Sequence, residues 1–440
     1  MAQPTHNIGR IVAGSLMVGL LTAMILVAIP FAGASENVIS GAVLVAFGLG
    51  WALLAILSTV RSDQPQRWAA LPATAFLVAG LTLIAWPGSV KVVALAWLWP
   101  LVLLALVGWM AVGARKQLRS RTRAWLLYPV FGILALSALG ATYENVQESR
   151  DRTLSSGPGR LVDVGGRRLH LNCVGSGAPT VVLFPGAGDL SSVMTWIASG
   201  VSRSTRVCAW DRAGRAWSDD ADGPQDGVAL STDLHTLMQR AQESGPFVLA
   251  GHSFGGLSAL NYAVRYPEEV AGMVLLDGTS TEMFTRLPSY PVVYESYRRV
   301  SALFPSLARL GVGRLAYRSA FDSLPAQSQR EERAFWSTAR LARSQRDEWG
   351  EAPILMQQAR RLQSLHDRPL IVLTAGLNAQ DGWIPLQNEL AKLSSNSEHR
   401  ILVNTEHASL TTNAGDARAS TQAIVDVVMA VRKGQPVTGH

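Results

Sequence analysis

One stretch just past the middle of the chain constrains the fold more than any other. It reads Phe247-Val-Leu-Ala-Gly-His-Ser-Phe-Gly-Gly256. Its apolar beginning is typical of a buried strand, and the pattern from Leu257 onward is typical of a helix. Between them lies Gly-x-Ser-x-Gly, centred on Ser253, which predicts a sharp turn from strand to helix. A side chain at either flanking glycine would collide with neighbouring backbone in so tight a turn.

This turn gives Ser253 a particular environment. The Ser253 hydroxyl would stand above the edge of the sheet, and the Phe254 N–H, at the start of the helix, would be free to donate to an oxyanion. We therefore interpret Ser253 as a nucleophile. The alternative is a glycine-rich turn without chemistry, because the pattern alone is only a hypothesis until its context supports it.

The first third of the chain is overwhelmingly apolar. It contains five apolar runs, residues 11–34, 38–60, 69–86, 92–114 and 124–143. A helix of about 20 residues crosses a bilayer, and no charge interrupts any run. Tryptophans near several ends fit the interfacial belt of membrane proteins. We predict an all-α transmembrane domain of about five helices over residues 1–145, rather than a set of buried soluble helices.

The loops between these runs predict an orientation. The loop of residues 115–123 has five Lys or Arg residues, whereas that of residues 35–37 has none. The positive-inside rule then puts the N-terminus in the cytoplasm and everything after Tyr143 outside it. The first run could instead be a signal peptide, since Ala32-Gly-Ala34 resembles a cleavage site, but its length favours a retained helix. We expect a multi-pass protein of the cell membrane whose second part is extracytoplasmic.

Charge and cysteine usage exclude other classes. The formal net charge is +7, but no Lys/Arg run is interleaved with aromatic residues, so we expect no nucleic-acid partner. The two cysteines, Cys173 and Cys208, lack the Cys/His spacing of a zinc site, and we expect no metal.

The rest of the chain has a different pattern. Residues 146–159 are polar and predict a linker. Over residues 160–440 apolar strands alternate with helices, which predicts an α/β domain with a mostly parallel sheet flanked by helices. Residues 280–365 interrupt the alternation with helical patterns rich in Arg and aromatic residues, which predicts a helical cap.

These features together resemble the α/β-hydrolase family, from about Arg160 to Arg432. The resemblance is carried by the turn at Ser253, by the Phe184-Pro-Gly-Ala-Gly188 segment, by Asp211-Arg-Ala-Gly and by a late histidine. It implies the α/β-hydrolase fold with a helical lid, and a catalytic triad in the chain order Ser, acid, His.

His407 is the best candidate for the base. It follows the last predicted strand, at the same carboxyl edge of the sheet as Ser253, whereas His252 is expected to pack into the protein. Two residues compete as the acid that orients the imidazole. Asp381, in Asp381-Gly-Trp-Ile-Pro385, resembles the family's usual acid motif, and we favour it. Asp277 ends the strand after the Ser253 helix, where some relatives keep their acid.

The resemblance also implies an oxyanion hole and a reaction. Two backbone N–H groups should stabilise the developing charge, those of Phe254 and, by alignment with the family, Ala187. The family commonly has His-Gly where this chain has Pro185-Gly186. The implied reaction is acyl transfer to water without a cofactor. A serine nucleophile argues against dehalogenase and epoxide-hydrolase chemistry, because those relatives use Asp there.

The substrate is less constrained. We expect a membrane-anchored carboxylesterase or lipase-like enzyme acting on a small-molecule or lipid ester. Aromatic residues of the 280–365 stretch could line an acyl pocket or simply form the core of the cap. Its arginines could face anionic lipid headgroups or solvent. Two rival functions are a peptidase or amidase of the same fold, and a membrane sensor that binds a ligand without turning it over.

The strand order of the family also places the two cysteines. It makes the strands of Cys173 and Cys208 neighbours, which we expect to be parallel, so a disulfide could form between them. Such a bond would persist outside the cytoplasm.

Overall fold

The computed structural model describes residues 8–86, 93–118, 125–154 and 157–437. The chain divides into two compact units. One comprises Met1–Arg152 together with Arg298–Leu315, and the other comprises Thr153–Tyr297 together with Ala316–His440. A piece of the predicted cap therefore belongs to the unit that contains the apolar helices.

The first unit is helical. Its long helices are α1 (Ile8–Ala28), α2 (Glu36–Arg61), α3 (Ala70–Ala85, after a 3-10 turn at Arg67–Ala69), α4 (Val93–Gln117) and α6 (Tyr128–Leu154). Among the described residues, four helices are long and apolar enough to cross a membrane: Ile8–Ala28, Glu36–Arg61, Arg67–Ala85 and Ala96–Gln117. The fifth predicted run forms the first half of α6. That helix is not one of the four, because it begins only at Tyr128 and continues into polar residues from Tyr143 onward.

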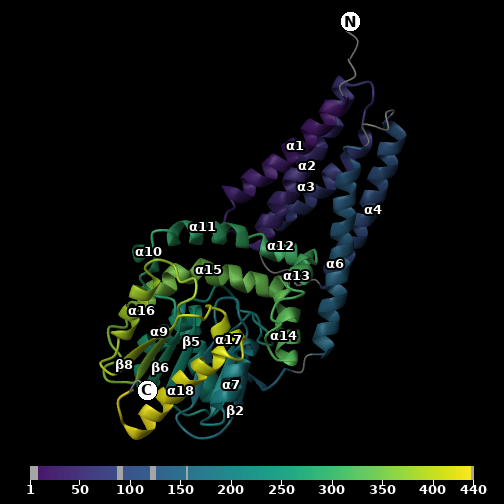
Figure 1. Cartoon of the computed structure of the whole chain (residues 1–440). Helices are drawn as coiled ribbons and strands as arrows, with labels where there is room; N and C mark the ends of the chain where they lie inside the picture. Colours follow the sequence, from purple (N-terminus) through teal and green to yellow (C-terminus); the bar gives the residue numbers. More distant parts are fainter. Residues whose placement is uncertain (1–7, 87–92, 119–124, 155–156, 438–440) are drawn as a thin grey trace. The chain divides into compact units, whose positions relative to one another are not determined.

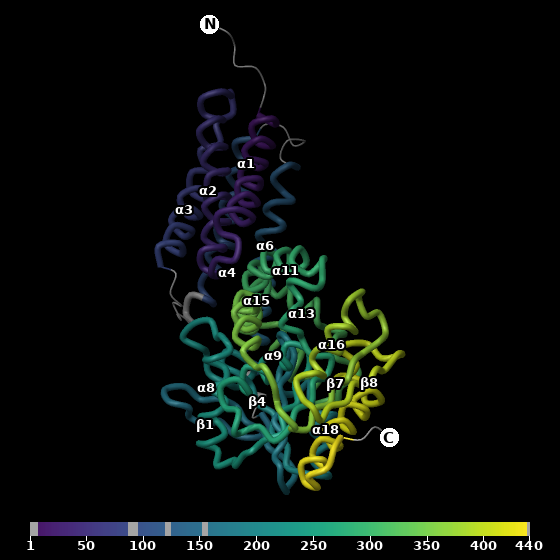
Figure 2. The backbone as a smooth tube through the Cα atoms, turned by 90° about the vertical axis from the view of Figure 1, so that its left-hand side faces the viewer, coloured from purple at the N-terminus to yellow at the C-terminus, as the bar shows by residue number. Residues whose placement is uncertain are grey.

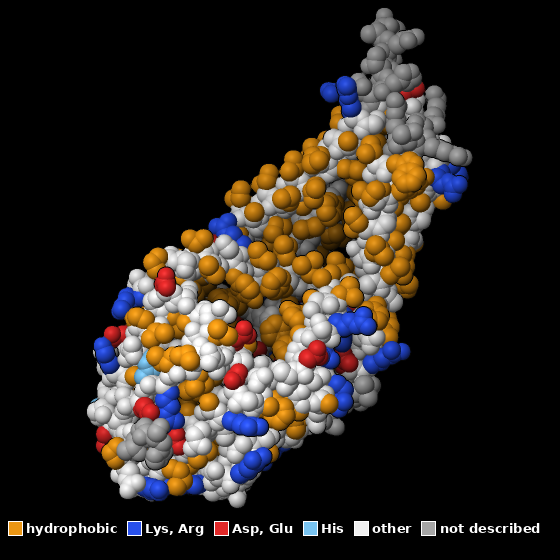
Figure 3. Space-filling view, viewed as in Figure 1, with side chains coloured by type: hydrophobic (Ala, Val, Ile, Leu, Met, Phe, Trp, Pro, Cys, Tyr) orange, Lys and Arg blue, Asp and Glu red, His pale blue; other side chains and the backbone are white. Residues whose placement is uncertain are grey.

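The helices α1, α2 and α3 lie side by side (Figures 1 and 2). Glycines allow α2 and α3 to approach closely. A Cβ on Gly41 would lie 2.7 Å from the Gly80 carbonyl oxygen, and one on Gly80 would lie 2.6 Å from that of Gly41. Small residues at such crossings are typical of helix packing in membranes. Figure 3 shows hydrophobic side chains over the outer surface of these helices, with Lys and Arg near their ends.

The cap piece of the first unit is tied to these helices by polar contacts. It contains α12 (Phe304–Arg309) and most of α13 (Val312–Ala316). The hydroxyls of Ser306 and Ser40 lie 2.7 Å apart, and Arg309 pairs with the buried Glu36. Arg314 Nε lies 2.9 Å from an oxygen of the buried Glu144. These two arginines therefore bind carboxylates of the same unit rather than standing free for lipid headgroups.

The second unit is built on one sheet of eight strands in the order β1-β2-β4-β3-β5-β6-β7-β8. The strands are β1 (Arg160–Asp163), β2 (Arg168–Val174), β3 (Val181–Phe184), β4 (Val207–Asp211), β5 (Phe247–His252), β6 (Val270–Leu276), β7 (Leu370–Ala375) and β8 (Ser397–Leu402). From β4 to β8 all neighbours are parallel, while β1 and β2 pair antiparallel. The expected α/β-hydrolase fold is confirmed.

Helices cover both faces because side chains alternate along each buried strand. In β3, Val182 and Phe184 pack on one face, and Val181 and Leu183 on the other. The first face is covered by α8 (Gly227–Arg240), α9 (Phe254–Arg265) and α16 (Trp383–Ala391), and the second by α7 (Thr195–Val201) and α18 (Asp416–Lys433). Figure 1 shows α7, the short α17 (Ser409–Thr412) and α18 over the same face.

The cap consists of short helices and one long one. They are α10 (Met283–Arg286), α11 (Tyr290–Ser301), α12, α13, α14 (Ala326–Trp336) and α15 (Ala339–Ala359). The 3-10 turns Ser191–Met194 and Pro267–Glu269 complete the described elements of the second unit. The prediction of a linker over residues 146–159 is wrong for its first part, because α6 continues as a helix as far as Leu154.

The cysteines are register partners in β2 and β4, and a disulfide of 2.05 Å joins Cys173 to Cys208. These strands are neighbours, as the resemblance implied, but they are antiparallel rather than parallel. The reason is that β2 is the second strand of a hairpin and runs against the strands that follow.

Candidate active site

The turn after β5 has the strain that its sequence predicts. Ser253 has a φ of 53° and a ψ of −124°, a conformation that few non-glycine residues adopt. A Cβ on Gly251 would lie 2.5 Å from the carbonyl oxygen of Gly255, and one on Gly255 would lie 2.1 Å from that of Phe184. Both positions therefore require glycine, and Gly255 in particular lets the start of α9 press against the end of β3.

The candidate base and one of the two candidate acids meet at this edge of the sheet. His407 Nδ1 lies 2.6 Å from Asp277 Oδ2, and Trp383 Nε1 donates to Asp277 Oδ1 at 2.7 Å. The Asp277 side chain is only 4% exposed, whereas that of His407 is 46% exposed. Both carboxylate oxygens of Asp277 thus have a hydrogen-bond partner, which satisfies the buried group and fixes its orientation.

The preferred acid, Asp381, is not beside His407. It is exposed in the loop before α16, and the structure gives Asp277 that position instead. The segment Asp381-Gly-Trp-Ile-Pro385 contributes through another residue, because its Trp383 is the one that donates to Asp277. The sequence analysis did not identify Trp383 as a site residue. The one signal for it was its position two residues after Asp381, where its indole N–H could donate to a carboxylate.

The other histidine of the Ser253 segment packs into the protein, as expected. His252 is 3% exposed, and its Nε2 donates to the backbone oxygen of His407 at 3.0 Å. Burial, and next the nearby His407, lower the pKa of His252 to about 3. His252 is therefore neutral at physiological pH and supports the backbone that carries His407.

The residues of the expected oxyanion hole face the same space as Ser253. A cavity of 320 Å³ is lined by both Ala187 and Phe254, as well as by Ser253, Asp277 and His407. The rest of the lining is largely apolar and comprises Thr279, Met283, Tyr290, Trp349, Ala375, Leu377, Asn378, Ala379, Gln380 and Trp383. Cavities of this size and character hold small organic ligands.

Most aromatic residues of the cap pack on one another instead of facing this cavity. Tyr290 and Trp349 line it. Phe284 packs edge-on against Tyr290 with ring centres 4.9 Å apart, and Tyr297 lies 4.6 Å from Trp349. Both alternatives for these aromatic residues therefore hold in part. Tyr290 and Trp349 line the cavity, and others pack against them in the core of the cap.

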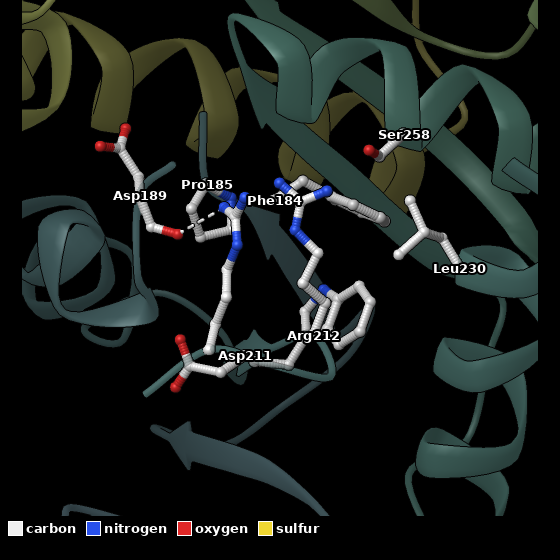
Figure 4. A pocket seen from close by; sticks show the side chains of 9 residues that line it. Phe184, Pro185, Asp189, Asp211, Arg212, Leu230 and Ser258 are labelled. Atoms are coloured by element: carbon white, nitrogen blue, oxygen red, sulfur yellow. Dashed lines mark hydrogen bonds between the residues drawn. The ribbon is translucent and has the colours of Figure 1, made fainter. Parts of the chain in front are cut away.

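A buried cluster of charges lies beside the oxyanion segment. Arg215, 1% exposed, donates through an Nη atom to Glu348 Oε2 at 2.5 Å and through another to the Asp189 backbone oxygen at 3.0 Å. Arg212 pairs with the other oxygen of Glu348. Figure 4 shows Asp189, Asp211 and Arg212 around a small cavity of 20 Å³ next to the end of β3. These arginines come from the Asp211-Arg-Ala-Gly-Arg215 segment, so that segment joins the core to helix α15 of the cap.

The comparison with protein families agrees with this fold. The model described as alpha/beta hydrolase fold matches residues 179–414, more than half of the chain. The chain therefore belongs to the α/β-hydrolase fold family.

Two uncharacterized proteins and one hydrolase are among the relatives that match parts of the chain. An uncharacterized protein of Schizosaccharomyces pombe is 26% identical over 302 residues, which are 60% of this chain and 54% of that protein. YbdG of Bacillus subtilis is 26% identical over 147 residues, 33% of this chain and 45% of that protein. The chain thus spans about half the length of these two relatives. The 2-hydroxy-6-oxo-2,4-heptadienoate hydrolase of Pseudomonas putida is 30% identical over 191 residues, 39% of this chain and 69% of that enzyme.

Solved structures show the same fold. The Cif epoxide hydrolase from Acinetobacter nosocomialis has a TM-score of 0.53 at 15% identity, covering 65% of this chain and 96% of that one. A putative lipase from Acinetobacter baumannii has a TM-score of 0.51 at 19% identity, covering 66% of this chain and 97% of that one.

Proposed function

We propose that this protein is a membrane-integral serine hydrolase that cleaves a carboxylic ester or lipid-like acyl substrate through an acyl-enzyme. One observation carries the proposal. Ser253, on its strained turn, faces the same cavity as His407, and His407 is hydrogen-bonded to the buried Asp277. A serine, an imidazole and a carboxylate that orients the imidazole form the set that activates a hydroxyl.

The chemistry follows from this arrangement. Asp277 holds the proton of His407 on Nδ1, which leaves Nε2 to accept the Ser253 proton as the hydroxyl attacks a carbonyl carbon. The N–H groups of Phe254 and Ala187 stabilise the oxyanion. His407 then returns the proton to the departing alcohol, and the acyl group stays on Ser253. Water attacks this acyl-enzyme in the same way and releases the acid.

The cavity favours an ester over a peptide. Met283, Tyr290 and Trp349 offer apolar contact to an acyl chain. A peptidase that trims N-termini needs an acidic group for the substrate amine. Among the described residues that line the cavity, the one carboxylate is Asp277, and His407 and Trp383 already occupy it.

The test uses the purified full chain in detergent with a series of p-nitrophenyl esters and a fluorophosphonate. We expect turnover that rises with acyl length until the cavity is filled, and covalent labelling of one serine per chain. Mass mapping of the tryptic peptides should find the label on Ser253. Absence of ester turnover, or a label on another serine, would overturn the proposal.

We further infer that the hydrolase unit is extracytoplasmic and that the apolar first half of α6 crosses the membrane after the four other spans. The charge of the loops supports this, and so does the Cys173–Cys208 disulfide, because the cytoplasm keeps thiols reduced.

The disulfide gives this orientation a direct test. When membranes are dissolved in denaturant that contains a maleimide, we expect no labelling of the wild-type chain before reduction and labelling of both cysteines after it. The Cys173→Ala variant is the control, since its Cys208 should react without reductant. Labelling of the unreduced wild type would contradict the extracytoplasmic placement.

A further inference from the structure

One carboxylate of the cap reaches the backbone of the oxyanion turn. Glu348, on α15, is 6% exposed, and its Oε2 accepts the Gly188 N–H at 2.8 Å. Gly188 follows Ala187, the candidate oxyanion donor that lines the cavity. The same Glu348 pairs with Arg212 and Arg215 from the core. A single cap side chain thus binds the turn directly and also binds the two arginines beneath it.

The turn is also held on either side of this bond, since the Asp189 N–H donates to the Gly186 carbonyl oxygen at 3.2 Å. Arg215 donates to the Asp189 carbonyl at 3.0 Å, and the Ser191 N–H donates to Asp211 Oδ1 at 2.7 Å. Gly188 has a φ of 77°, and a Cβ there would lie 2.3 Å from Gln345 Nε2, also on α15. The part of the turn next to Ala187 thus lies against α15, and the positive φ of Gly188 favours glycine there.

The direction of an oxyanion donor matters as well as its presence. Donors stabilise the transition state because they are already aimed at the position of the oxyanion and need not reorganise during the reaction. The Gly188 N–H and the Ala187 carbonyl share one rigid peptide plane, so a bond to that N–H limits rotation at Ala187. Losing the bond leaves the turn free to rotate and the Ala187 N–H poorly aimed.

The Glu348 carboxylate has two kinds of partner, the arginines Arg212 and Arg215 and the Gly188 N–H. The buried face of the helix carries Leu341, Gln345, Glu348, Ala352 and Leu355 at helical spacing. Glu348 is the charged member of that row, and an apolar side chain there would leave the two buried arginines without their carboxylate. Burial is also the main cause that lowers the pKa of Arg215, to about 10, so this guanidinium remains charged at neutral pH and needs its partner.

We propose that Glu348 is a positioning residue that binds the oxyanion turn to cap helix α15, so that the oxyanion hole is complete only while α15 is docked on the core. The proposal rests on the proposed hydrolase function, and it assigns to the cap a part in catalysis besides lining the cavity. Glu348 acts through the Gly188 peptide and does not touch the substrate.

The test compares Glu348→Gln with Glu332→Gln in the full chain. Glu332 is a matched control, because it is also a buried carboxylate of the cap. It accepts from the Ser192 hydroxyl at 2.7 Å and from Trp336 Nε1 at 2.9 Å, and the structure gives it no bond to Gly188. Each variant replaces one buried carboxyl group of the cap with an amide, but only Glu348→Gln weakens the hold on the turn.

The readouts are kcat and KM for a short ester and the affinity for an alkyl boronic acid, whose tetrahedral adduct with Ser253 uses the oxyanion hole. Removal of one donor costs about a hundredfold to a thousandfold in kcat, and we expect about tenfold to a hundredfold for a misaimed donor. The loss in Glu348→Gln should appear equally in kcat and in boronate affinity with KM unchanged, while Glu332→Gln keeps both within about threefold. Equal effects of the two variants, or wild-type kcat in Glu348→Gln, would overturn the proposal.

A second variant covers the case in which Glu348→Gln does not fold. Glu348→Asp keeps the charge for the arginines but withdraws the carboxylate from Gly188, so it should fold and still lose kcat. Wild-type kcat in Glu348→Asp would also overturn the positioning role. The wild type is assayed first, because absence of ester turnover there refutes the hydrolase function and the positioning role with it, whereas an active wild type with an unaffected variant refutes the positioning role alone.

Discussion

Ester turnover by the Ser253→Ala variant should fall by about a millionfold in kcat, because removing the nucleophile of a triad costs nearly as much as removing the whole triad. The residual rate should come from the oxyanion hole and from binding. KM should change little, since the Ser253 hydroxyl contributes to the transition state rather than to ground-state binding. Steady-state assays with the p-nitrophenyl ester measure kcat and KM. Single-turnover assays with the same ester show, in addition, whether an acyl-enzyme accumulates.

A neighbouring serine provides the control. Ser258 lies one turn further along α9 and hydrogen-bonds the Phe254 carbonyl at 3.4 Å. It is absent from the lining of the 320 Å³ cavity. Ser258→Ala should keep its kcat within about threefold, as expected of a small change away from the reacting atoms. If Ser253→Ala retained most of the wild-type activity, the serine mechanism would be refuted.

Asp277→Asn should lower kcat by about ten-thousandfold, because an amide at this position stabilises the wrong tautomer of the imidazole. In the wild type His407 Nδ1 lies 2.6 Å from the carboxylate and Trp383 donates to the other oxygen. The asparagine can accept one of these hydrogen bonds but must turn a donor toward the other. The fall should persist at every pH between 6 and 9, which separates a tautomer effect from a shifted titration.

Asp381→Asn is the matched control for the acid. Asp381 is exposed and has no described hydrogen bond to His407, so its variant should retain wild-type kcat. The opposite pattern, an active Asp277→Asn and an inactive Asp381→Asn, would show that Asp381 is the acid after all.

The choice between these two acids marks the limit of what the sequence could predict. The Ser253 turn, His407 and both aspartates follow strands, and the carboxyl ends of parallel strands meet at one edge. That rule places both Asp277 and Asp381 near the base and cannot rank them. The decision depends on the path of the loop between β7 and α16, which brings Trp383 rather than Asp381 toward the site.

The sheet and its faces could be predicted because they rest on local patterns. Apolar strands alternate with helices, and each buried strand has a continuous apolar run. The direction of β2 could be predicted against β1, its hairpin partner, but not against β4. The contacts of the cap could not, because they join residues such as Arg309 and Glu36 that are 273 positions apart and belong to no recognisable motif.

The sequence contains one sign of the role that we propose for Glu348, which becomes clear only with the structure. A charged residue within the apolar row of an amphipathic helix indicates a buried partner. The row contains Leu341, Glu348 and Leu355, seven positions apart. Nothing in the sequence identifies the partner as a backbone N–H of the oxyanion turn.

The polar contacts of α12 and α13 have a consequence for how this protein can be divided. A chain that begins at Arg160 lacks Glu36 and Glu144, and so leaves Arg309 and Arg314 without the carboxylates that bind them. It also deprives Ser306 of its partner Ser40, in a segment where Leu315 is already 76% exposed. The insertion thus completes its fold only with the apolar helices. A cut in the chain between its two parts would therefore leave these ion pairs and this hydrogen bond to hold the cap piece on the apolar helices.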